Sequence, residues 1–108
     1  MLLLNIDYVP GRTIQALGLV KGSVVQAKNF GRDFMAAMKN LVGGELEDYT
    51  QLLSQARQIA TKRMVDEAQE LGADGVVNVR YASSSLMQGA AEITVYGTAF
   101  RFADWEGD

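Results

Sequence analysis

Residues 43–80, GGELEDYTQLLSQARQIATKRMVDEAQELGADGVVNVR, decide the fold of this chain. Apolar side chains recur there every three or four residues, which predicts an amphipathic helix of about seven turns. The acidic first turn complements the helix dipole, and Gly72 stands where a left-handed residue ends a helix. The alternation in Val76–Arg80 then predicts a strand with Val77 and Val79 on one face. The apolar helix stripe is Leu46, Tyr49, Leu52, Leu53, Ala56, Ile59, Ala60, Met64, Ala68 and Leu71.

The remaining elements are strands and one short helix. Gly43-Gly44 separates the two helices, and Ser83-Ser84-Ser85 begins a polar turn that ends near Gly89. Gly18 and Gly22 lie inside a predicted strand, where glycine indicates a bend, a bulge or the close approach of another backbone. Strands are predicted over Leu2–Ile6, Thr13–Ala27, Val76–Ala82 and Ala90–Phe102, and the short helix over Arg32–Leu41.

The order β-β-α-α-β-β predicts an α+β fold in which an antiparallel sheet wraps around one long helix. One helix covers only one face of such a sheet, yet the last strand is apolar on both faces. An exposed stripe of Tyr96, Phe100 and Phe102 would be large for a monomer, so we expect other copies of the chain to bury it. The alternative is that the short helix, with Met35 and Met38, folds over that face.

The orientation of Phe100 follows from the same alternation. If Ile93 and Val95 pack on the long helix, Phe100 points to the opposite face of the sheet. Its burial would then depend on a neighbouring subunit.

Histidine and cysteine are both absent from the 108 residues. Their absence excludes disulfides, thiolate nucleophiles, Ser-His-Asp triads and Cys/His zinc sites. A net charge of −3 without a basic run argues against nucleic-acid binding. No apolar run approaches the roughly 20 residues of a membrane span. The apolar start of the chain is too short for the hydrophobic region of a signal peptide and lacks the basic residues that precede one. We therefore expect one cytoplasmic domain over residues 1–108, with no membrane contact.

A set of spaced residues along nearly the whole chain resembles the YbjQ-like family of small bacterial and archaeal proteins. The family carries a heavy-metal-binding label. The resemblance implies a dodecin-like subunit in a ring-shaped homo-oligomer, with a pentamer favoured, and implies no catalytic residue and no cofactor. The set is Asn29, Arg32-Asp33-Phe34, Val42-Gly43-Gly44, Tyr49, Leu53, Ala56-Arg57, Ala60, Met64, Ala68, Leu71-Gly72-Ala73, Val76-Val77, Val79-Arg80 and Gly97-Thr98-Ala99.

Several polar and aromatic residues are candidates for binding a ligand or a neighbouring subunit. Repeated around a ring axis, Arg80 suits a small anionic ligand, and the alternative is a salt bridge between subunits with Glu92. Arg32 and Asp33 suit an anion or a partner subunit, although Asp33 also suits a helix cap. The full set is Arg32, Asp33, Asn78, Arg80, Glu92, Tyr96 and Phe100.

The sequence offers few ligands for a soft metal. Soft metals prefer thiolate, thioether and imidazole donors, and thiolate and imidazole are absent. Methionines on an apolar helix face ordinarily fill the core. The acids Glu45, Glu47 and Asp48 suit a hard cation, or simply complement the helix dipole.

These features favour a non-enzymatic, homo-oligomeric binding or scaffold protein. One alternative is a metal-binding protein, as the family label states. Another is an enzyme that works through carboxylates and tyrosines such as Asp33, Glu92 and Tyr96.

Overall fold

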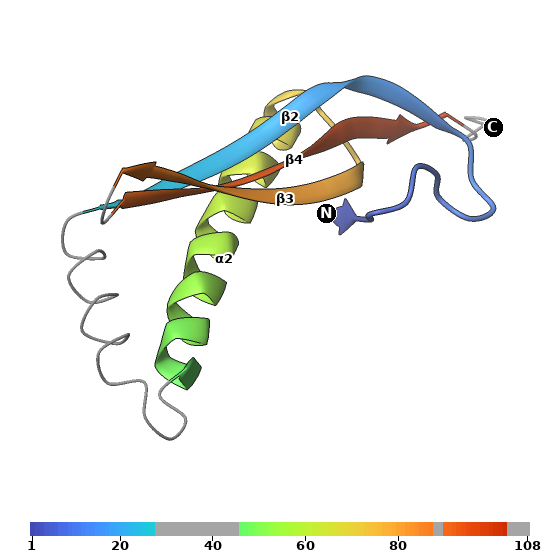
Figure 1. The fold of residues 1–108 in the computed structure, drawn as a ribbon. Coiled ribbons are helices and arrows are strands. Elements are labelled where there is room, and N and C mark those ends of the chain that lie inside the picture. Colours follow the sequence, from blue (N-terminus) through green and yellow to red (C-terminus); the bar gives the residue numbers. More distant parts are fainter. Residues whose placement is uncertain (28–45, 88–89, 104–108) are drawn as a thin grey trace.

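The computed structural model describes residues 1–27, 46–87 and 90–103, which form a four-stranded sheet and one long helix (Figure 1). The predicted short helix at 32–41 and the Gly43-Gly44 hinge lie outside these residues. The elements are β1 (Leu2–Leu3), β2 (Ile14–Ala27), α2 (Leu46–Glu70), β3 (Gly75–Met87) and β4 (Ala90–Phe102).

The sheet order is β1-β3-β4-β2, and the sheet is mixed. Strands β2 and β3 flank β4 and are antiparallel to it, whereas β1 runs parallel to β3, with Leu2 opposite Gly75. The prediction of a wholly antiparallel sheet is therefore wrong at this edge. A parallel pair needs a long crossover, and the chain between β1 and β3 provides one because it contains β2 and α2.

Helix α2 packs on one face of the sheet and crosses its strands, while its N-terminal part extends beyond the sheet (Figure 1). The predicted apolar stripe supplies the buried contact through Ala56, Ala60, Met64 and Ala68, although Ile59 remains exposed. From the sheet, the core on the helix side receives Val20, Val24, Val76, Ile93, Val95 and Ala99.

Glycines set the distance and the shape of this contact. A β-carbon on Gly22 would collide with the carbonyl oxygen of Ala60 and lie 2.5 Å from the nitrogen of Met64. At Gly18, where φ is 146°, a register shift interrupts the pairing of β2 with β4. The predicted bulge and close backbone approach are both confirmed.

The end of α2 is a Schellman motif. The amide of Ala73 donates to the carbonyl of Ala68 (3.1 Å), and the amide of Gly72 donates to that of Gln69 (3.0 Å). Gly72 has φ 74°, as the sequence predicts for a residue that ends a helix.

Strand β3 differs from its prediction in two ways. Ser83-Ser84-Ser85 forms no turn, because these residues pair with Ile93, Glu92 and Ala91 of β4 and extend the strand to Met87. Val77 and Val79 also lie on different faces, because a bulge separates them. At this bulge Asn78 takes φ 56°, a conformation that asparagine tolerates better than most residues.

The N-terminal segment, residues 2–12, covers one end of the face of the sheet that points away from α2. Its backbone follows the β3 bulge, with hydrogen bonds from Val79 N to Leu4 O (3.0 Å) and from Asn78 N to Ile6 O (2.9 Å). Beneath it, Phe100 is completely buried with Val9 and Val77 in a second core cluster. The expectation that the burial of Phe100 depends on a neighbouring subunit is therefore wrong, because it overlooked this segment.

Candidate functional site

Two predicted site residues, Asn78 and Arg80, hold the N-terminal segment. The half-buried Asn78 donates its backbone N–H to the carbonyl oxygen of Ile6. The exposed Arg80 donates from Nη1 to the carbonyl oxygen of Asn5 (3.1 Å). Within one chain, both residues therefore have a structural role. Arg32 and Asp33 lie outside the described residues.

The far face is the side of the sheet away from α2, and it brings together three of the predicted residues. Tyr96 pairs with Arg80 on β3, and Glu92 lies four residues before Tyr96 on β4. Phe100 belongs to the same face but is sealed by the N-terminal segment, so no ligand reaches it. We define the far face as Leu19, Lys21, Ser23, Val25, Arg80, Ala82, Ser84, Glu92, Thr94, Tyr96 and Thr98, which alternate with the helix-side core.

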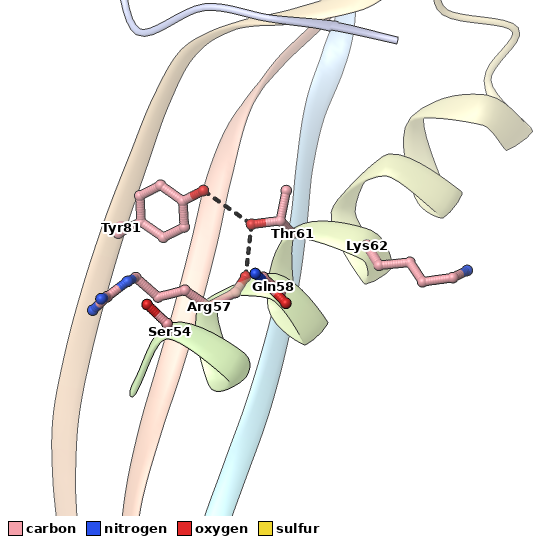
Figure 2. A pocket seen from close by; sticks show the side chains of 6 residues that line it. All are labelled: Ser54, Arg57, Gln58, Thr61, Lys62 and Tyr81. Carbon is pink, nitrogen blue, oxygen red and sulfur yellow. Dashed lines mark hydrogen bonds between the residues drawn. The ribbon is translucent and has the colours of Figure 1, made fainter. Parts of the chain in front are cut away.

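A pocket lies on the opposite side of the sheet, between α2 and β3 (Figure 2). Its volume is about 660 Å³, within the range that small-molecule sites occupy. Five of its six lining residues come from one stripe of α2, and Tyr81 of β3 forms the facing wall. The lining residues are Ser54, Arg57, Gln58, Thr61, Lys62 and Tyr81.

A chain of hydrogen bonds fixes the wall of the pocket against the helix. The Thr61 hydroxyl donates to the carbonyl oxygen of Arg57 (2.7 Å), and the hydroxyl of Tyr81 lies 2.9 Å from the same Thr61 oxygen. Since the Thr61 proton is engaged with the carbonyl, the Tyr81 hydroxyl is the donor in the second bond. The Tyr81 ring is thus positioned across the opening, with half of its surface exposed.

The two cations of the pocket differ in their surroundings. Lys62 is paired with Asp66, one turn further along α2, at 3.1 Å. Arg57 is half-buried, and among the described residues no carboxylate or other acceptor binds its guanidinium. In Figure 2, Arg57 extends toward the β3 side of the pocket and Lys62 extends in the opposite direction. Within the part of the chain that the structure describes, the pocket therefore offers one cation without a partner beside neutral polar groups.

This pocket was not predicted from the sequence, where the apolar stripe of the helix gave the only signal that was used. A second stripe, Ser54, Arg57, Gln58, Thr61 and Lys62, repeats at the same helical spacing and contains no acidic residue. That pattern is the signal which the sequence offered. Tyr81 lies inside the predicted strand Val76–Ala82, but its contact with this stripe is a tertiary feature that spacing along the sequence does not show.

Comparison with known proteins places the chain in a family. The model of the YbjQ family, described as "Putative heavy-metal-binding", matches residues 1–103. The chain belongs to the YbjQ family. Its relatives include a UPF0145 protein of Clostridium novyi, 55% identical over 101 residues that cover 94% of this chain and 98% of the relative. A UPF0145 protein of Thermus thermophilus is 54% identical over 102 residues, covering 94% and 90% of the two chains.

A solved structure supports the YbjQ fold. It is a protein of unknown function from Pediococcus pentosaceus, assigned to the DUF74 family, with a TM-score of 0.67. The match covers 94% of this chain and 97% of the other, at 13% sequence identity, so the likeness concerns the fold alone.

The heavy-metal description of the YbjQ family does not fit the donors in this chain. Soft metals prefer thiolate, thioether and imidazole donors, and the sequence contains no cysteine or histidine, which leaves methionine sulfur as its one soft donor. In residues 1–27, 46–87 and 90–103, no three acidic side chains come together in a group that could hold a metal ion. Across the same residues, no helix is both long and apolar enough to span a membrane.

Proposed function

We propose that this protein is a non-enzymatic binding or scaffold protein that works as a homo-oligomer, with five subunits favoured. The observation that carries the proposal is the apolar exposure of the far face. Leu19 is 70% exposed, Val25 53% and Tyr96 40%. Leu19 and Val25 lie on β2, and Tyr96 lies on the neighbouring β4 opposite Lys21. A second copy of the chain on this face would remove these side chains from water.

The edges of the sheet support the same proposal. β2 is an edge strand, to whose backbone α2 supplies side-chain partners at Lys21 and Ser23. At the other edge, β1 covers β3 only at Gly75 and Val76. The N-terminal segment extends this cover to Val79, which leaves the outer edge of β3 from Tyr81 to Met87 without a strand partner among the described residues. An unpaired strand edge is a template for pairing with another chain.

The two edges differ from one another, which favours a ring. If β2 of one subunit meets β3 of the next, the contact joins two different surfaces. A contact of this kind generates a closed ring when its rotation closes. It agrees with the ring-shaped pentamer that the family resemblance implies.

Native mass spectrometry with light scattering tests the proposal at micromolar protein concentration. We expect five subunits for the wild type and dissociation for Leu19→Glu and Tyr96→Glu, since each places a charge in the far-face contact. Gln69→Glu, an exposed position on α2, adds the same charge elsewhere and should keep the assembly. A stable wild-type monomer would refute the proposal.

A further inference from the structure

We propose that the pocket between α2 and β3 binds a small organic anion, through a phosphate or carboxylate group held by Arg57. The inference specifies a ligand for the binding role proposed above and rests on that role. It concerns a different surface from the far face, and the residues that carry it are Arg57, Tyr81 and Thr61.

The state of Arg57 is the first step. A guanidinium is always charged and presents a planar fork of donors that matches a phosphate or a carboxylate. Here the side chain is half-buried, so it has lost part of its hydration, yet no described group accepts from it. Donors that are desolvated and lack acceptors cost free energy. An oxyanion beside Arg57 would accept hydrogen bonds from the guanidinium in place of the water that burial has removed.

The charge of the lining is the second step. None of the six lining residues is acidic, so nothing in the wall repels an anion. The nearest cation along the stripe, Lys62, forms an exposed ion pair with Asp66 and extends away from Arg57. The other polar groups of the wall, Ser54 and Gln58, carry donors that can bind an oxyanion at its sides.

The facing wall explains why the ligand should carry an apolar part. Tyr81 stands on β3 with half of its surface exposed, and its hydroxyl is engaged with Thr61. The hydroxyl is therefore committed to the helix, while the ring remains available to pack against an apolar group. Apolar walls with a few placed polar groups are the usual composition of small-molecule pockets. The ligand best suited to this geometry has an acidic head and a flat or short apolar body.

Calorimetric titration of the full-length protein tests the inference with four probes: phenyl phosphate, benzoate, inorganic phosphate and the neutral benzyl alcohol. We expect one phenyl phosphate or benzoate per chain, with inorganic phosphate weaker because it lacks the ring. The stronger of the two aromatic anions identifies the acidic group. Benzyl alcohol should bind at least about tenfold more weakly, since a charge-assisted hydrogen bond contributes a factor of that size.

Variants separate the roles of the residues. Arg57→Gln should weaken anion binding by about tenfold or more. Tyr81→Phe, which releases the ring from Thr61, should weaken it by about threefold through lost positioning. Arg101→Gln is the control, since it removes a cation from an exposed position on β4 outside the pocket, and it should leave the affinity unchanged.

The outcomes that overturn the inference are specific. They are the absence of saturable anion binding up to about 1 mM, equal affinity for benzyl alcohol, or equal affinity in Arg57→Gln. Native mass spectra of the same samples count the subunits separately. A pentamer that binds no anion therefore refutes only this inference, and a monomer that binds the anion refutes only the proposed assembly.

Discussion

Arg63 of α2 donates a hydrogen bond of 2.6 Å from Nη1 to the backbone carbonyl oxygen of Ser23 in β2. Two residues away, the backbone amide of Lys21 donates to Oε1 of Glu67, one turn further along the helix, at 3.0 Å. Both backbone groups belong to an edge strand, and they flank Gly22, where the helix backbone approaches most closely. The helix thus protects the middle of the edge by supplying side-chain partners to its free backbone groups.

Removal of the Glu67 carboxylate should expose the Lys21 amide. We expect Glu67→Ala to increase the hydrogen-exchange rate of that amide by about fivefold to tenfold, because loss of a hydrogen bond of about 1 kcal/mol eases local opening. Amide exchange followed by NMR measures it. Glu70→Ala removes an exposed carboxylate from the same helix and should leave the Lys21 rate unchanged. Equal acceleration in both variants would contradict the assigned role of Glu67.

Gly22 should be intolerant of any side chain. We expect Gly22→Ala to lower the free energy of unfolding by about 2–3 kcal/mol or more, because the new β-carbon collides with backbone atoms that cannot rotate away. Urea denaturation measures the loss. Gly11→Ala is the control: its φ is 74° and its surroundings are open, so only backbone strain of about 1–2 kcal/mol should appear. A smaller loss at Gly22 than at Gly11 would contradict the close contact.

The fold was predictable from the sequence where a local residue pattern is compatible with only one kind of secondary structure. The helix stripe, the helix end at Gly72 and the bulged, closely approached β2 followed from spacing and from glycine. The errors arose where one segment's environment depended on a distant one. Ser83-Ser84-Ser85 has weak strand propensity, yet its pairing with β4 holds it extended. In the same way, the cover of Phe100 comes from a segment more than 90 residues earlier in the sequence.

The candidate site was less predictable than the fold. Asn78 and Arg80 were predicted as site residues because they are polar residues in a strand. In the structure they lie at the bulge and hydrogen-bond the N-terminal segment. The register shift that creates the bulge is a tertiary feature, because it accommodates the backbone of Leu4 and Ile6. Arg57, in contrast, lay in a readable polar stripe, and only the facing Tyr81 required the structure.

Asp74 should contribute to stability through the end of β4. Its amide donates to the carbonyl of Phe100 and its carboxylate accepts the amide of Phe102, both at 2.8 Å. We expect Asp74→Ala to cost about 1–2 kcal/mol in unfolding free energy, and Asp74→Asn less, since the amide oxygen still accepts. Urea denaturation of the three proteins tests the order. An Asp74→Ala variant as stable as the wild type would show that the second bond contributes nothing.

Phe100 should behave as a core residue of the single subunit and not as an interface residue. It is completely buried beneath Val9 in the second core cluster, in edge-to-face contact with Phe102 at a centroid distance of 5.3 Å. We therefore expect Phe100→Ala to lower the free energy of unfolding by about 3–5 kcal/mol. Tyr96→Ala, on the same face of the same strand but 40% exposed, should change the fold stability of the subunit by less than about 1 kcal/mol.

A truncation separates the two explanations for the burial of Phe100. Deletion of residues 1–9 removes the cover and leaves Phe100 in place, so it should destabilise the subunit about as much as Phe100→Ala does. Adding Phe100→Ala to the truncated chain should then cost little more, because the ring has already lost its contacts with the segment. Circular dichroism during urea denaturation measures all four chains, and size-exclusion chromatography reports their assembly. A folded but dissociated Phe100→Ala subunit of wild-type stability would instead assign the ring to a contact between copies.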